Sequence, residues 1–277
     1  IKTYSTNTEF SLYDSENFPI QSKFELGVEY TFNKNKLLSY IENVKISAST
    51  EPENLAVNCI RFEIEENKLK LISSDTYRLT YIEEELEENE KNKEGLSVSI
   101  PLKTIDGLIK IMRLINEDNI IFKSDGTRVF FKFSNIEILT RVIELQFPDY
   151  KSILKSAQHD KKILLNTKDF LSVLKRTLIF VRDNKDSKNG GIFNFENKKL
   201  VLTGINENAK IKEELVTIQE GDNLKISLNV KFLLDYISIL EGKVTELKLM
   251  TSKSSVLVKS EENDKSLYFT MPLALRE

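Results

Sequence analysis

The chain is poor in the residue types that carry most protein chemistry. Its 277 residues include one cysteine, one histidine, no tryptophan and nine glycines. A single cysteine excludes an internal disulfide and is typical of a protein from a reducing cytoplasm. Cys59 lies in the strand-like run V-N-C-I-R-F, so we expect a buried apolar residue rather than a nucleophile. No apolar run approaches the length that spans a bilayer.

Catalysis has little support in these residues. The only histidine, His159, lies in the polar segment S-A-Q-H-D-K-K. A His-based metal site or a Ser-His-Asp triad would need partners that the sequence hardly supplies. The acidic run at 83–94 has no apolar period, which favours a solvated loop. A minor alternative is a hydrolase that uses its first acids, Glu83, Glu84 and Glu85. We therefore expect no catalytic residue, no metal and no cofactor.

The same order of predicted elements occurs twice along the chain. N-K-N-K-L-L-S at 33–39 aligns without a gap on N-T-K-D-F-L-S at 166–172, and the strand pair at 60–73 is matched at 192–204. Each unit is about 125 residues long, which is an ordinary domain size. Helices are predicted over 33–49, 102–116, 166–183 and 229–240, with strands between them. The sequence predicts an α+β fold of duplicated domains, each with two helices packed on antiparallel sheets.

These patterns also predict domain boundaries. We expect one domain over 23–151 and a second over 152–277. Residues 1–22 are too few to fold alone. With the strand-like piece T-E-F-S-L-Y at 8–13, they are expected to be the end of a preceding domain and a linker.

Basic residues concentrate on the predicted helices, although the net charge of the chain is −3. The first three helices each carry two more basic than acidic residues. Residues spaced by about two helical turns share a face. A surface for the phosphates of duplex DNA is therefore predicted, formed by Lys34, Lys45, Lys103, Lys110, Arg113, Lys168, Lys175 and Arg182. The alternative is that these side chains are merely solvated.

The segment K-L-K-L-I-S-S-D-T-Y-R-L at 68–79 is the most informative stretch. Leu69 and Leu71 alternate with lysines, as in a half-buried strand. The short polar side chains of Ser73, Ser74, Asp75 and Thr76 then favour a turn.

Four motifs together resemble one family. They are S-S-D-T-Y-R-L at 73–79, F-P-D-Y at 147–150, L-N-V-K-F-L-L-D-Y at 228–236 and Y-F-T-M-P-L-A-L at 268–275. In this order, on a duplicated domain, they resemble the second and third domains of the bacterial DNA polymerase III beta subunit, the sliding clamp. Residues 1–22 are then similar to the end of the first domain.

The resemblance implies a DNA-clamp fold and a non-catalytic processivity factor. Such a protein encircles duplex DNA without sequence specificity, associates with the nucleoid in the cytoplasm, and forms a head-to-tail homodimer ring when its first domain is present. It tethers the replicative polymerase, the clamp loader and other proteins that carry a Q-L-x-L-F motif. An alternative is an interaction module that keeps the partner pocket without encircling DNA.

The resemblance also implies where the partner pocket lies. By position its walls would be Val57, Ser74, Thr76, Tyr77, Arg78, Leu79, Pro148, Ile153, Asn229, Phe232, Ser255, Phe269, Thr270, Met271, Pro272 and Leu273. Three residues depart from the family pattern. Thr76 occupies a position where glycine is common, Ser152 one where arginine is frequent, and Ala274 one where a basic residue is usual. We expect these departures to alter the peptide preference.

Overall fold

The computed structural model describes residues 1–14, 16, 27–156, 158–183 and 187–274. Its first repeat contains β1 (Val28–Asn33), α1 (Lys34–Lys45), β2 (Cys59–Glu65), β3 (Lys68–Ser74), β4 (Arg78–Glu85), β5 (Leu96–Pro101), α2 (Leu102–Leu114), β6 (Asn119–Ser124), β7 (Arg128–Phe133) and β8 (Ile136–Arg141). A short helix, α3 (Tyr150–Ser156), precedes the second repeat.

The second repeat follows the same order with one additional short strand, β13. It contains β9 (Lys161–Asn166), α4 (Thr167–Val181), β10 (Gly190–Glu196), β11 (Lys199–Ile205), β12 (Lys210–Val216), β13 (Ile218–Glu220), β14 (Leu224–Asn229), α5 (Val230–Ile237), β15 (Val244–Leu249), β16 (Val256–Ser260) and β17 (Asn263–Thr270). The internal repeat and the α+β class are thus confirmed.

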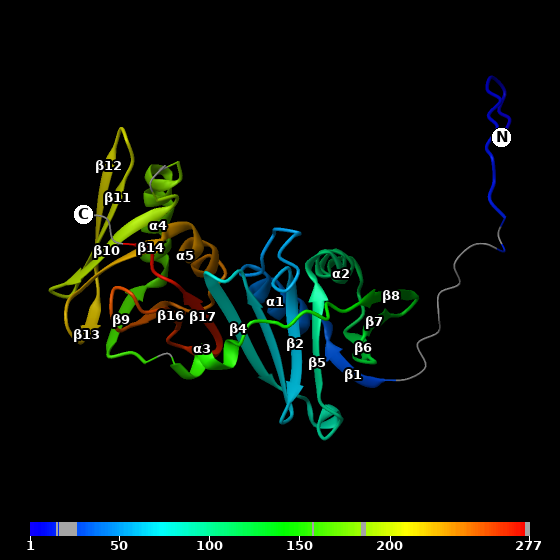
Figure 1. The fold of residues 1–277 in the computed structure, drawn as a ribbon, viewed down its shortest axis with the longest axis horizontal. Coiled ribbons are helices and arrows are strands. Elements are labelled where there is room, and N and C mark those ends of the chain that lie inside the picture. Colours follow the sequence, from blue (N-terminus) through cyan, green and yellow to red (C-terminus); the bar gives the residue numbers. More distant parts are fainter. Residues whose placement is uncertain (15, 17–26, 157, 184–186, 275–277) are drawn as a thin grey trace.

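One sheet runs through both repeats. Its nine strands follow the order β13-β9-β15-β16-β17-β4-β3-β2-β5, and each repeat also has a four-stranded sheet of its own. The two repeats meet where β17 pairs antiparallel with β4, from Ser266↔Ile82 to Thr270↔Arg78. In Figure 1 these two strands lie between α1 and α2 on one side and α4 and α5 on the other. Backbone hydrogen bonds across this strand pair therefore join the repeats.

Asparagine caps start the aligned helices. The side-chain oxygen of Asn33 accepts from Lys36 N at 3.0 Å, and that of Asn166 accepts from Asp169 N at 3.1 Å. The two caps have nearly the same backbone angles, φ −62° with ψ 120° and 121°. Each cap satisfies an amide that has no partner within its helix. The gap-free alignment of the two asparagines therefore reflects a local structure that occurs twice.

Each repeat has its own apolar core, and a smaller cluster lies at their junction. The two cores fill the space between helices and sheets, with Phe62 and Phe122 fully buried in the first and Phe170 and Phe193 in the second. The junction cluster contains Cys59, Ile72, Leu79, Tyr81, Phe147, Tyr150, Leu257 and Phe269. Cys59 is fully buried, as predicted from its strand-like run.

The prediction of a solvated loop over 83–94 is wrong in part. Strand β4 continues to Glu85, because Glu83 and Glu85 lie opposite Lys70 and Lys68 on β3. Opposite charges on paired strands stabilise the pairing. Beyond the strand, a short 3₁₀ helix spans Glu88–Glu90.

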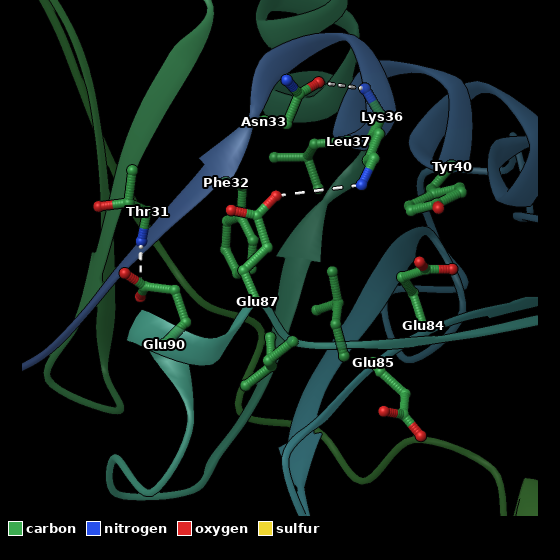
Figure 2. A pocket seen from close by; sticks show the side chains of 12 residues that line it. Thr31, Phe32, Asn33, Lys36, Leu37, Tyr40, Glu84, Glu85, Glu87 and Glu90 are labelled. Carbon is green, nitrogen blue, oxygen red and sulfur yellow. Dashed lines mark hydrogen bonds and ion pairs between the residues drawn. The ribbon is translucent and has the colours of Figure 1, made fainter.

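Glu90 is buried in this segment. Its carboxylate accepts from Thr31 N at 2.9 Å and pairs with Lys93 at 2.7 Å, and Figure 2 shows it pointing at Thr31. A buried carboxylate is tolerated here because it has both a hydrogen-bond donor and a cation.

Two further predictions are corrected. Thr8–Tyr13 forms no strand, and the described N-terminal residues contain only the isolated bridge between Lys2 and Asn7. A lone strand-like segment has no neighbour that would satisfy its backbone. The first and last predicted helices are also shorter, since α1 ends at Lys45 and α5 at Ile237. The boundary predicted at residues 22 and 23 lies outside the described residues.

Candidate functional site

Two hollows lie at the junction of the repeats, on either side of the β3–β4 turn. We call the first the loop-side hollow, because the segment 48–57 between α1 and β2 forms much of its wall. It has a volume of about 760 Å³ and is also lined by Leu145, Pro148 and Phe232. The tail-side hollow, of about 360 Å³, lies against Ile153, the segment 253–255 and the end of β17. Both are lined by Thr76, Tyr77 and Arg78, so we treat them as one groove divided by this turn.

The dividing turn is held by its own side chains. Asp75 Oδ1 accepts from the backbone amides of Tyr77 and Arg78 at 3.0 Å, and the Ser74 hydroxyl donates to Arg78 O at 2.8 Å. Thr76 has φ +76°, a left-handed conformation that is rare for a β-branched residue. The turn therefore holds a threonine in a conformation that favours glycine.

The β6–β7 turn repeats this geometry with glycine in place. In Ser124-Asp125-Gly126-Thr127-Arg128, Asp125 Oδ1 accepts from the amides of Thr127 and Arg128, and Ser124 Oγ donates to Arg128 O at 3.0 Å. Gly126 has φ +87°. The two turns thus share one hydrogen-bond pattern and differ at the third and fourth residues, Thr76-Tyr77 against Gly126-Thr127.

Arg78 connects the turn to the second repeat. Its Nε bonds Asp75 Oδ2 at 2.8 Å, and its Nη1 bonds Asp235 Oδ2 of α5 at 3.1 Å. The guanidinium also lies 4.1 Å from the centre of the Phe232 ring, within the range of a cation–π contact. Only 13% of the Arg78 side chain is exposed. The charge of Arg78 is therefore satisfied by two carboxylates and is not available to a ligand.

The C-terminal tail closes the groove on the far side of Tyr77. Met271 N donates to Tyr77 O at 2.8 Å, and Leu273 N donates to Ser227 O at 2.8 Å. Tyr77 is 65% exposed and Met271 is 47% exposed. The backbone bond therefore brings together two large, exposed side chains that are far apart in the sequence. Exposed apolar residues grouped at a hollow are typical of a binding surface.

Most of the residues expected from the resemblance line one of the two hollows. Val57, Pro148 and Phe232 line the loop-side hollow, whereas Ser74, Leu79, Ile153, Ser255, Phe269, Thr270 and Met271 line the tail-side hollow. Asn229, Pro272 and Leu273 line neither. The Asn229 side chain instead caps α5 by accepting from Phe232 N at 3.1 Å. Its place at the start of the predicted helix over 229–240 is itself a capping signal, like that of Asn33 and Asn166.

Several groove residues were not expected from the sequence. Leu55 and Leu145, 51% and 52% exposed, line or border the loop-side hollow, and Lys253 lines the tail-side hollow. Asp235 is the second partner of Arg78. An apolar residue within a polar loop is only weak evidence of a binding surface. Leu55 and Leu145 indicate one only after the fold has placed their two segments side by side.

The predicted basic surface needs one correction. Lys34 is buried, with 8% exposure, and its Nζ donates to Ile115 O at the end of α2 at 2.7 Å. It therefore caps a neighbouring helix and cannot face DNA. Lys45 pairs with Asp106 and Arg113 with Glu42. Lys103, Lys110, Lys168 and Lys175 are exposed and make no ion pair with any residue that the structure describes.

The acids of the hydrolase alternative lie on β4. Glu83 bonds Lys68 at 2.6 Å, and Glu84 pairs with Lys265 at 2.6 Å. Glu83 and Glu84 point to opposite faces, as successive strand residues do. Figure 2 shows Glu84 beside Tyr40 and Glu87 reaching Lys36, around a small cavity of about 40 Å³. Glu83 and Glu84 are thus paired with lysines of the neighbouring strands β3 and β17.

No described helix combines the length and apolar character needed to cross a membrane. Within the residues that the structure describes, no group of three or more His, Cys, Asp or Glu side chains is arranged to hold a metal ion.

The chain is similar to known proteins over nearly all of its length. Residues 31–149 match the family model of the DNA polymerase III beta subunit, central domain, and residues 153–274 match its C-terminal domain. The beta sliding clamp of Buchnera aphidicola subsp. Rhopalosiphum padi is 27% identical over 275 residues, which cover 97% of this chain and 72% of that protein.

Solved structures show the same fold. The DNA polymerase III beta subunit of Thermotoga maritima superposes with a TM-score of 0.87 at 25% identity, covering 95% of this chain and 70% of that one. A sliding clamp from Pseudomonas aeruginosa bound to griselimycin gives a TM-score of 0.85 at 22% identity, covering 94% and 69%.

Proposed function

The chain belongs to the DNA polymerase III beta subunit family, and we propose that it encircles duplex DNA and tethers partner proteins through the groove at the junction of its repeats. The observation that best supports partner binding is the pair of hollows that meet at Tyr77. A tether acts by raising the effective concentration of its partner, so a weak peptide contact is sufficient. In this role the chain performs no catalysis itself.

The groove has the chemistry that a short apolar motif requires. Leu79, Ile153 and Met271 supply an apolar wall on the tail side, while Ser254 and Ser255 supply polar groups beside it. Ligand sites commonly combine such a surface with a few polar groups that fix orientation. The griselimycin complex of the Pseudomonas aeruginosa relative supports the view that this fold can hold a ligand.

Peptide binding tests the proposed pocket directly. We expect a labelled Q-L-x-L-F peptide to bind saturably in a fluorescence-anisotropy titration. Replacing an anchor residue of an interface typically costs more than about 1 kcal/mol, so Met271→Ala should weaken binding roughly fivefold or more. Leu114→Ala is a matched control, because Leu114 is 83% exposed on α2 and outside the groove. No binding to folded protein would refute the pocket.

The exposed lysines of α2 and α4 support contact with DNA phosphates. Each phosphate contact that is lost should reduce the slope of log K against log salt by about 0.9. We therefore expect Lys103→Gln with Lys110→Gln to reduce this slope by roughly 2. Lys132→Gln with Lys199→Gln, on strands β7 and β11, should leave the slope unchanged. Equal slopes for both pairs would contradict the proposed DNA face.

Retention on circular DNA distinguishes an encircling clamp from the alternative, an interaction module that does not encircle DNA. A homodimer ring that includes the first clamp domain should remain on closed circular duplex and leave it when the duplex is cut. An interaction module would show no such difference. The division of this chain into clamp domains over 23–151 and 152–277 is part of the proposal, and the matched ranges 31–149 and 153–274 support it.

A further inference from the structure

We propose that the groove selects partner peptides by the charge of the residues on either side of the bound motif. It prefers a basic segment before the motif and an acidic segment after it. This inference rests on the proposed function, because it assumes that the groove binds a partner peptide. It concerns residues of this chain that the resemblance did not assign to the pocket.

Charges of opposite sign line the two hollows of the groove. Glu51 and Glu53 line the loop-side hollow, and Lys253 lines the tail-side hollow. All three are exposed, and none makes an ion pair with another residue in the described part of the chain. The one hydrogen bond that Glu51 accepts from a side chain comes from the neutral amide of Asn54, at 2.8 Å. Glu51, Glu53 and Lys253 therefore keep their charge for a ligand.

The middle of the groove contributes little net field. Arg78 is the most central charge, and it is held between Asp75 and Asp235 at 2.8 and 3.1 Å. Because the charges of this cluster neutralise one another, the electrostatic field along the groove is set by Glu51, Glu53 and Lys253. A bound peptide thus meets negative charge in the loop-side hollow and positive charge in the tail-side hollow.

The lining of the hollows sets the direction of the peptide. A Q-L-x-L-F motif has a polar first residue and an apolar last pair. Leu79, Ile153, Phe269 and Met271 make the tail-side hollow the better site for that apolar pair. The glutamine then lies in the loop-side hollow, among the polar groups of segment 48–57. Residues before the glutamine approach Glu51 and Glu53, and residues after the phenylalanine approach Lys253.

Two peptides of identical composition test this inference. Both carry the same Q-L-x-L-F core and blocked ends; one has two lysines before the core and two glutamates after it, and the other has the order reversed. Exposed ion pairs are each worth roughly a threefold change in affinity. We expect the lysine-first peptide to bind the full chain about tenfold more tightly at low salt. The difference should shrink at high salt, because exposed charges are screened.

A charge-swapped variant gives the matched comparison. Glu51→Lys, Glu53→Lys and Lys253→Glu together should invert the preference between the two charged peptides. Glu220→Lys, Asp222→Lys and Lys225→Glu make the same change in net charge on exposed residues outside the groove. That control should keep the original preference.

The outcomes separate the inference from the function on which it rests. Equal affinities of the two peptides at low salt, with the core still bound, would overturn the charge preference. The proposed peptide pocket would still be supported. Tighter binding of the glutamate-first peptide would overturn the direction. Binding of none of the peptides would overturn the pocket itself.

Discussion

Replacement of Arg78 by alanine is expected to destabilise the junction of the two repeats. The change leaves the carboxylates of Asp75 and Asp235, 15% and 24% exposed, without their shared cation, and it removes the contact with the Phe232 ring. Breaking a fully buried ion pair costs about 3–5 kcal/mol. Asp235 keeps Lys231 as a partner, and Asp75 keeps two backbone amides. We therefore expect a loss of about 2–4 kcal/mol in the free energy of unfolding.

The twin turn of the first repeat provides the control. Arg128 Nε bonds Asp125 Oδ2 at 2.9 Å in the same geometry, but 34% of the Arg128 side chain is exposed. A partly exposed ion pair is worth up to about 1 kcal/mol, so Arg128→Ala should cost no more than that. Urea unfolding followed by circular dichroism measures both variants. A loss for Arg78→Ala no larger than the loss for Arg128→Ala would refute the role of the junction cluster.

Three further predictions follow from single residues. Thr76→Gly should raise the melting temperature. Glycine relieves about 1–2 kcal/mol of strain in the left-handed conformation, which exceeds the roughly 0.5–1 kcal/mol that its greater freedom in the unfolded chain costs. A lower melting temperature would show that Thr76 is not strained. Burial opposes ionisation of Asp125, but hydrogen bonds from Arg128 and Thr127 outweigh it and lower its pKa to about 2. The stability that this carboxylate contributes is present above its unfolded pKa and is lost as the pH falls through the folded pKa. In the Asp125→Asn variant, the free energy of unfolding should therefore fall less steeply between about pH 4 and pH 2. Burial raises the pKa of the Cys59 thiol to about 11, and the side chain is fully buried. A thiol reagent at pH 8 should therefore react with native protein at least about 100-fold more slowly than with unfolded protein. Comparable rates would show that the thiol is accessible.

Local signals in the sequence predicted the elements well, because their causes are local. The asparagines at 33 and 166 cap their helices through amides three residues away. Leu69 and Leu71 alternate with lysines, and the structure buries the leucines and leaves both lysines partly exposed. Asp75 holds its turn through the next amides of the chain. The two caps and the turn need no distant partner, and the strand pattern is set by alternating side chains.

The errors arose where a distant segment decides the environment. Charge alone suggested that residues 83–94 are solvated, yet Lys68 and Lys70 on β3 extend the strand to Glu85. Helical spacing placed Lys34 on a basic face, but its ammonium lies at the end of α2 and bonds Ile115 O. In both cases the partner comes from another element, whose position is set by packing and not by the spacing of residues in the sequence.

The sequence by itself determined the duplication, the class of fold and the turn at 74–78, since these depend on apolar period and on side chains that bond their own backbone. Only the tertiary structure decided what that turn does. The pairing of β17 with β4 brings Met271 to Tyr77 and α5 to Arg78, and so forms a groove from segments that are far apart in the chain. Glu51, Glu53 and Lys253 make no ion pair with any residue that the structure describes, and the sequence could not show this, because an ion pair forms only between groups that the fold places in contact.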